Sequence, residues 1–375
     1  MSWYHYVLIV GIVLAEALTH FGTVEGDSWE FFNVTKYLLG IEPLESPHRI
    51  IRPLVPALAA PLYYLLGLPM SYGLVNTLFY VLSGIFAYKL GLELTKSRVA
   101  GLVSSLLLIT SPPMIAYGSA SHYQAGPIFF QFFVIYLAIR WMNALELKRA
   151  ATLGVVSGLG VLAGESVATS IASTLLLMVL RGRSLGLLLY VTFIAPFLTV
   201  PLILGGYDWI RWYLVQNVGG YAPYANLDSP IVWLDPFNRI RHFVVGISFA
   251  ATLGLLYGFL REDNRERAVI FYVMLLPALL AWLAWPPVNY RVLYPMFHAV
   301  YWIAGAGLLS IAQDLSSKPV LRRVPKYVWL VVILVLNAFI SNWYVTRYYY
   351  LLYGPGMWGP FDWISVPSLE MLEMR

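Results

Sequence analysis

The chain has 375 residues, of which 59% are hydrophobic and only 11% are charged. An ordinary soluble domain is about a quarter charged, so this composition excludes a soluble globular protein and predicts an all-α integral membrane protein. The lack of cysteine excludes a disulfide framework, a thiolate metal site and a thiol nucleophile. The net charge of +5 does not indicate nucleic-acid binding, because the cations are scattered between apolar runs and form no basic face.

Apolar runs of about 20 residues, the length that crosses a bilayer, recur along the sequence with Trp and Tyr near their ends. They predict about eleven transmembrane helices, at residues 3–20, 70–92, 99–117, 125–142, 151–164, 166–180, 185–204, 241–260, 268–286, 293–312 and 328–346. We expect one transmembrane domain over residues 1–346 and a C-terminal tail, rich in Gly and Pro, over residues 347–375. No internal repeat is visible, so an inverted-repeat transporter gains no support.

The apolar segment 53–68 is a special case. It is short and contains Pro53, Pro56 and Pro61, so its backbone would leave polar groups unsatisfied in lipid. We therefore expect it to lie along the membrane interface rather than to span.

The distribution of cations supports this choice. With residues 53–68 outside the membrane core, 15 of the 24 Lys and Arg residues fall on one side of the membrane. By the positive-inside rule that side is cytoplasmic. The N-terminus is then inside, and the loops 21–69 and 205–240 and the C-terminal tail are external.

The first external loop is dense in charge within an apolar chain. Between residues 25 and 52 it holds five carboxylates and the cations Lys36, Arg49 and Arg52. Our hypothesis is that Asp27, in Gly26-Asp27-Ser28, is the catalytic acid-base residue. The alternative is that Asp27 only caps a helix.

Ionisable residues at the membrane edge are further candidates. Glu165 lies between two Gly-broken spans, where it would line a cavity or pair with an arginine. Glu16 and His20 are one helical turn apart on the first span and face the same way, which favours a structural hydrogen-bonded pair over a cavity-lining role.

Two more candidates sit at external helix ends. His122 lies in a polar turn between the third and fourth spans, where solvation is the simpler explanation and anion binding the functional one. Arg291, after Tyr290, opens a late span at the external face. It would bind a substrate phosphate with its planar fork or snorkel to lipid headgroups.

Motifs for other chemistry are missing from the sequence. It has no phosphate-cradling Gly-x-x-x-x-Gly-Lys loop, no His-Glu-x-x-His and no Gly-x-Ser-x-Gly. Its six histidines show no metal-ligand spacing.

Several short motifs, taken in their order along the chain, resemble those of the GT-C class of membrane glycosyltransferases, which includes the protein mannosyltransferase and aminoarabinose transferase-like enzymes. The match covers about residues 1–315 and is carried by Gly26-Asp27-Ser28, Arg52-Pro53-Leu54-Val55-Pro56, Thr110-Ser111-Pro112-Pro113, Gly164-Glu165-Ser166 and Tyr290-Arg291-Val292-Leu293-Tyr294-Pro295 followed by Gly305-Ala306-Gly307-Leu308. The sequence departs from the class at two places. Many members have two adjacent acidic residues in the first loop, but here Ser28 follows Asp27. Many also have an acidic residue between the third and fourth spans, where this chain has His122, Tyr123 and Gln124.

The resemblance implies an inverting transfer of sugar from a polyprenyl- or dolichyl-phosphate donor to a glycan, lipid or protein acceptor. Asp27 would be the general base. Arg291, helped by Arg49, Arg52 or His122, would stabilise the charge on the leaving phosphate. Glu165, Glu16, His20 and Tyr290 would line the cavity.

The resemblance also predicts a multi-pass protein of the cell membrane, in contact with its lipids, with the active site on the external face. No cofactor is firmly implied, and a divalent metal is not supported because these positions offer no pair of aspartates. A polytopic transporter or lipid flippase is the alternative function, because it too would have charged external mouths.

Overall fold

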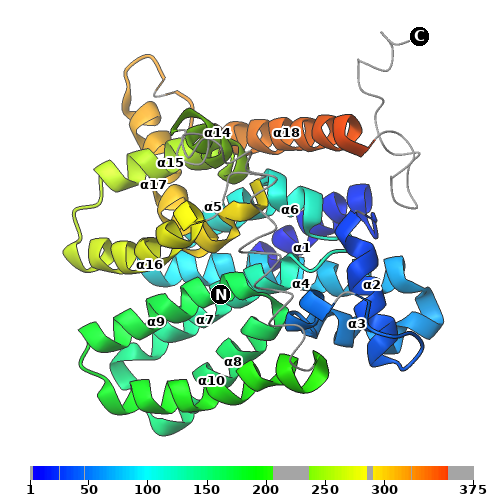
Figure 1. Ribbon diagram of the computed structural model, residues 1–375. Coiled ribbons are helices and arrows are strands. Elements are labelled where there is room, and N and C mark those ends of the chain that lie inside the picture. The colour runs from blue at the N-terminus through cyan, green and yellow to red at the C-terminus, as the bar shows by residue number, and fades with distance from the viewer. Residues whose placement is uncertain are drawn as a thin grey trace, which may run out of the picture.

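The computed structural model describes residues 3–24, 26–45, 47–205, 236–284, 290–321 and 323–353. Every regular element in these ranges is a helix (Figure 1). In chain order the elements are α1 (Tyr4–His20), α2 (Gly26–Leu38), η1 (Pro47–Ile51), α3 (Leu54–Leu66), α4 (Leu68–Thr95), α5 (Arg98–Ile109), α6 (Pro112–Tyr117), α7 (Ala125–Trp141), η2 (Met142–Ala144), α8 (Leu147–Ala163), η3 (Glu165–Val167), α9 (Ala168–Leu180), α10 (Ser184–Gly205), α14 (Pro236–Ile247), α15 (Phe249–Leu260), α16 (Arg265–Ala284), η5 (Tyr290–Met296), α17 (Phe297–Ser317) and α18 (Lys326–Tyr353).

Five of the described helical segments are long and apolar enough to cross a membrane, namely α4, α10, α16, η5 with α17, and α18. The segment of η5 and α17 is the most buried of the five, whereas α10 and α18 expose most of their apolar side chains, as helices that face lipid do. For the described residues, an all-helical structure with several helices long and apolar enough to span a membrane is thus confirmed. The number of eleven spans and the N-inside orientation stay predictions.

Two of the expected spans are broken, so the prediction of continuous helices there was wrong. Residues 99–117 form α5 and α6, which are separated at Ser111 because Pro112 and Pro113 follow it and the residue before a proline is pushed out of the helical region. Residues 241–260 belong to α14 and α15, separated at Ser248, whose φ is 81°. The Ser248 hydroxyl accepts a hydrogen bond from the Ala251 backbone N at 3.4 Å and so caps α15.

The last helix also differs from expectation. We expected the final span to end at residue 346, but α18 continues to Tyr353. Of the expected C-terminal tail, residues 354–375 lie outside the described residues.

Helices α15 and α17 touch backbone to backbone. A Cβ atom added at Gly307 would lie 1.8 Å from the Gly254 carbonyl oxygen, and one added at Gly258 would lie 2.4 Å from the Ile303 carbonyl oxygen. Small residues allow membrane helices to approach this closely. The glycines therefore fix α17 in the centre of the bundle.

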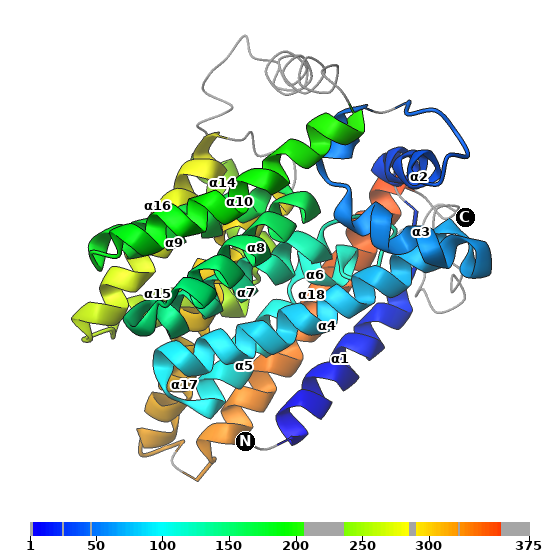
Figure 2. The same ribbon diagram turned by 90° about the horizontal axis from the view of Figure 1, so that it is seen from below.

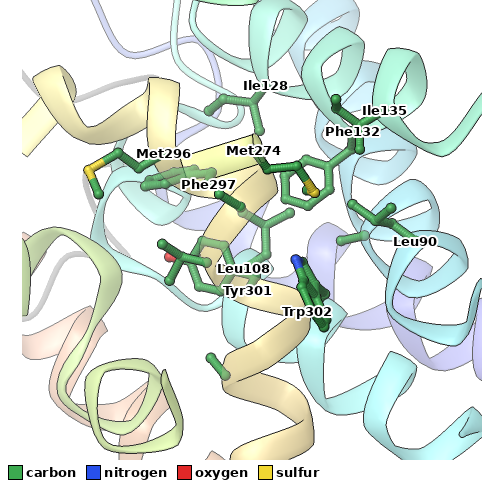
Figure 3. Packing of buried hydrophobic residues seen from close by; sticks show 14 of the residues in the cluster. Leu90, Leu108, Ile128, Phe132, Ile135, Met274, Met296, Phe297, Tyr301 and Trp302 are labelled. Atoms are coloured by element: carbon green, nitrogen blue, oxygen red, sulfur yellow. The ribbon is translucent and has the colours of Figure 1, made fainter. Parts of the chain in front are cut away.

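The apolar core surrounds α17. Trp302 and Tyr301 of this helix are fully buried, and Figure 3 shows them among side chains of α4, α5, α7 and α16, including Leu90, Leu108 and Met274. Close packing of this kind holds each helix in a fixed register.

Helices α2 and α3 lie across one end of the bundle (Figure 2), which we call the Asp27 end. The 13 residues of α3 extend about 20 Å, too short for a hydrocarbon core of about 30 Å. The buried face of α3 packs against α2 and α4, while Leu58, Tyr64 and Leu65 are exposed. A location of α3 in the external membrane interface stays a prediction.

Candidate active site

At the Asp27 end, the turn after α1 is hydrogen-bonded to the segment between α6 and α7. The Gly22 backbone N donates to the Ser119 carbonyl oxygen at 2.9 Å, and the Ser121 backbone N donates to the Thr23 carbonyl oxygen at 2.8 Å. Gly22 has a φ of +66°, and a Cβ there would be 3.0 Å from the Pro69 carbonyl oxygen. This crossing fixes the start of α2 against the segment that carries His122.

Asp27 lies in the first turn of α2, inside the helix rather than before it, where a carboxylate is favoured by the helix dipole. Its Oδ1 is 3.2 Å from Nη2 of Arg49 and its Oδ2 is 3.6 Å from Nε2 of His122. The Asp27 side chain is 35% exposed, whereas the His122 side chain is fully buried. The structure thus brings two predicted site residues, Arg49 and His122, to a third, the partly exposed carboxylate of Asp27.

Hydrogen bonds and ring packing fix the position of His122 next to Asp27. The side-chain amide of Asn76 donates hydrogen bonds to the carbonyl oxygens of Ala120, at 2.7 Å, and of His122. The ring of His122 packs edge-on against Phe31, with centroids 5.5 Å apart. The solvated turn that we considered for His122 is therefore wrong, because its apolar neighbours bury it.

Arg49 also binds a second carboxylate, which sequence reasoning did not place in the site. Its Nε donates to Oε2 of Glu30, and Nε2 of His48 lies 3.5 Å from the same oxygen. Burial would raise the pKa of the Glu30 carboxyl, but the hydrogen bond from His48 and the charge of Arg49 outweigh burial and lower it below its ordinary value. Glu30 is therefore a stable anion that holds η1 to α2.

A usable signal for Glu30 was present in the sequence. Glu30 follows Asp27 by three residues, and side chains at this spacing share one face of a helix. His48 had no such signal, because its position depends on how η1 folds back onto α2.

Arg52 and Glu165 form a separate pair. Nε of Arg52 donates to Oε2 of Glu165 at 2.6 Å, and Nη2 donates to Oε1, so the pair is bidentate. The guanidinium also lies over the ring of Tyr123, 4.2 Å from its centroid. Of the two roles considered for Glu165, pairing with an arginine is the one observed, and the Glu165 side chain keeps 41% of its surface exposed.

Two predicted residues lie on α1. Oε1 of Glu16 accepts a hydrogen bond from the side-chain amide of Asn342 at 3.0 Å, which joins α1 to α18. His20 is buried at the end of α1, and its carbonyl oxygen accepts from the Thr23 hydroxyl at 2.8 Å. The cavity-lining role of both residues stays a prediction.

Tyr290 and Arg291 begin η5, but their side chains lie outside what the structure describes. The η5 segment packs against α16 and α14 and also touches η3, which carries Glu165. The Thr169 hydroxyl donates to the Pro295 carbonyl oxygen at 3.2 Å. The backbone that carries Arg291 is thus adjacent to the Glu165 turn, and its contact with a phosphate stays a prediction.

Chemically, the Asp27 end offers a proton acceptor beside groups that can bind an anion. Asp27 can take a proton from a hydroxyl, and guanidinium and imidazole N–H groups can donate to phosphate oxygens. Within the described residues, no three His, Asp or Glu side chains are grouped so that they could hold a metal ion. The prediction about a metal remains untested.

No protein-family model matches the sequence, and no curated protein matches it by sequence. Solved structures do match the fold. One is ArnT from Cupriavidus metallidurans in the apo state, with a TM-score of 0.55 and 12% identity, covering 91% of this chain and 72% of that one. The same protein bound to undecaprenyl phosphate gives a TM-score of 0.54 and 12% identity, covering 92% and 73%.

The Archaeoglobus fulgidus oligosaccharyltransferase in the apo form also matches, with a TM-score of 0.53 and 13% identity. The match covers 92% of this chain but 56% of that protein. At such low identity the likeness is one of fold. It confirms the expected resemblance: this chain has the fold of the GT-C membrane glycosyltransferases.

Proposed function

We propose that this protein is a membrane glycosyltransferase that transfers a sugar from a polyprenyl-phosphate-linked donor to an acceptor hydroxyl on the external face. The observation that carries the proposal is the Asp27 carboxylate, partly exposed and fixed between Arg49 and His122 at one end of a GT-C fold. A carboxylate in this position can act as a base only if its orientation is held, and two contacts from different elements hold it here.

The reaction would proceed by direct displacement. Asp27 accepts the proton of the acceptor hydroxyl while the acceptor oxygen attacks the anomeric carbon. The bond from that carbon to the phosphate oxygen breaks, and the leaving polyprenyl phosphate keeps the electron pair. Attack opposite the leaving group inverts the anomeric carbon.

The lipid-phosphate donor is supported by the neighbours in fold. ArnT has been solved with undecaprenyl phosphate, and AglB from Archaeoglobus fulgidus with dolichol-phosphate and an inhibitory peptide, the latter at a TM-score of 0.50. Arg291 is the cation we assign to the donor phosphate. Arg49 is 15% exposed and pairs with Asp27 and Glu30, and Arg52 pairs with Glu165. Each would have to release a carboxylate before it could bind phosphate, so we assign both a supporting role.

The test is the release of polyprenyl phosphate by the purified protein in liposomes, supplied with a panel of undecaprenyl- and dolichyl-phosphate sugars and a panel of glycan, lipid and peptide acceptors. Asp27→Asn keeps the size of the side chain and removes the proton acceptor. It should lower the transfer rate by about a hundred- to ten-thousand-fold, as loss of a general base does. A folded Asp27→Asn protein that transfers sugar at the parent rate would reject the base.

Glu42→Gln is the matched control, because Glu42 is a carboxylate of the same loop whose partner is Lys36, 2.6 Å away, rather than Arg49. This variant should keep the parent rate. The same liposomes distinguish a flippase: a donor that crosses the bilayer with its sugar-phosphate bond intact in the parent protein would overturn glycosyl transfer.

A further inference from the structure

A cavity of about 470 Å³ lies among the helix ends far from Asp27. It is formed where α4, α7 and α9 end and α16 begins, together with η2. Its volume is in the range of small-molecule sites, about 300–1,000 Å³. Nothing in the proposed transfer reaction uses it.

The rim of the cavity is charged and carries more cations than carboxylates. Lys96, Arg181 and Arg267 line it with only Glu93 and Glu266. Nζ of Lys96 lies 2.8 Å from Glu93 of the same helix, and Arg181 of α9 pairs with Glu266 of α16. Among the side chains that line the cavity, cations therefore exceed carboxylates by one, and the Arg181–Glu266 pair joins two of the walls.

Arg267 supplies a donor without an acceptor. Its Nη2 is 2.9 Å from Glu262, which does not line the cavity. Its Nε is buried and has no hydrogen-bond partner among the residues that the structure describes. Because solvent does not reach this N–H, the cavity attracts an anion through the combined charge of its rim cations Lys96, Arg181 and Arg267 rather than through this donor.

The deeper lining is apolar, with Ile139, Leu177 and Ile270 from three different helices. A soluble anion would gain nothing from such a wall, whereas an acyl chain would. Basic pockets between membrane helices bind the head groups of anionic lipids. We propose that this cavity binds an anionic phospholipid, with its phosphate at Arg267 and Arg181 and its acyl chain against Ile139 and Leu177.

The test is native mass spectrometry of the full-length protein titrated with phosphatidylglycerol or phosphatidylcholine. The parent protein should prefer phosphatidylglycerol. Arg267→Gln should weaken that binding about tenfold or more, the effect of losing a charged hydrogen bond. Arg149→Gln is the matched control, because it removes an arginine that pairs with a glutamate, Glu146, but does not line the cavity, and it should bind as the parent does.

Ile139→Trp provides an independent variant, because it fills the cavity and keeps every charge. It should also reduce phosphatidylglycerol binding. If a folded Arg267→Gln or Ile139→Trp protein bound phosphatidylglycerol as well as the parent does, the proposal would be overturned. Displacement of the lipid by millimolar inorganic phosphate, which would identify a site for soluble anions, would overturn it too.

Discussion

At the scale of single residues, the candidate site depends on contacts between side chains that are distant in sequence. Asp27, Arg49 and His122 were each predicted from their positions near helix ends, and the structure places Asp27 3.2 Å from Arg49 and 3.6 Å from His122. Glu30 joins the cluster through Arg49, and His48 joins it through Glu30. Sequence patterns identify residues that suit a site, but only the fold shows which of them share a partner.

His122 should act as a positioning residue for Asp27. Because its buried ring fixes one carboxylate oxygen, His122→Gln should lower the transfer rate by about ten- to a hundred-fold, as small misplacements of reacting groups do. Binding of undecaprenyl phosphate should change much less. Rate and lipid affinity measured on the same preparation separate the two effects, and an equal fall in both would instead place His122 at the donor phosphate.

Glu30 makes the stability of the protein depend on pH. Since the pKa of Glu30 is lowered in the folded protein, its contribution to stability is complete above its unfolded pKa, about 4.3, and is lost as the pH falls through the folded value. Glu30→Gln should therefore be less stable than the parent at pH 7 and should lose less stability between neutral pH and about pH 3. Thermal unfolding of the detergent-solubilised proteins across this range measures both, and parallel curves would contradict the assignment.

At the scale of elements, the sequence identified which segments are helical better than where they break. The apolar runs predicted α1, α4, α7, α10 and α16 to within a few residues. The break at Ser111 had a visible cause in Pro112 and Pro113, but the break at Ser248 depends on a positive φ that no local pattern announces. Apolar runs alone therefore overestimate the length of some helices.

Arg52 and Glu165 connect the first loop to the turn between α8 and α9. Removing one member of a buried ion pair costs about 3–5 kcal/mol, whereas an exposed pair contributes about 0–1 kcal/mol. Because Glu165 is 41% exposed, we expect a coupling of about 1–2 kcal/mol between these limits. A double-mutant cycle with Arg52→Gln and Glu165→Gln measures it, and additive effects of the two changes would show that the pair stabilises nothing.

The contact of α15 with α17 should tolerate no added atom. Gly307→Ala places a methyl group 1.8 Å from the Gly254 carbonyl oxygen, so the two helices must separate, at a cost of about 1–3 kcal/mol. Gly11→Ala is the control, because a Cβ at Gly11 in α1 meets nothing within 4 Å. Thermal unfolding should show a lower midpoint for Gly307→Ala and an equal or higher one for Gly11→Ala.

At the scale of the whole molecule, one group of cations lies away from Asp27. Lys96 and Arg181, which follow α4 and α9, and Arg267, in the first turn of α16, line one cavity. Arg261 pairs with Asp314 near the end of α17 at 2.8 Å. These cations belong to the 15 that the sequence assigns to the cytoplasm. The fold does not determine the orientation of the protein in the membrane, because the same fold is compatible with either orientation.

Because the chain has no cysteine, single cysteines can report that orientation without a background. We predict that Ser46→Cys, in the first loop, reacts with a membrane-impermeant maleimide on intact cells. Ser184→Cys, at the start of α10 beside the basic turn, should react only after the membrane is opened. The reason is the positive-inside rule combined with a non-spanning α3.

The two alternatives give different labelling patterns. If residues 53–68 crossed the membrane, every later loop would change sides, and both cysteines would be labelled from the same side. If the whole protein were inverted, Ser184→Cys would react on intact cells and Ser46→Cys would not. An interfacial α3 predicts that, on intact cells, Ser46→Cys is labelled and Ser184→Cys is not. This result would also place Asp27 on the external face, where an acceptor outside the cell could reach it.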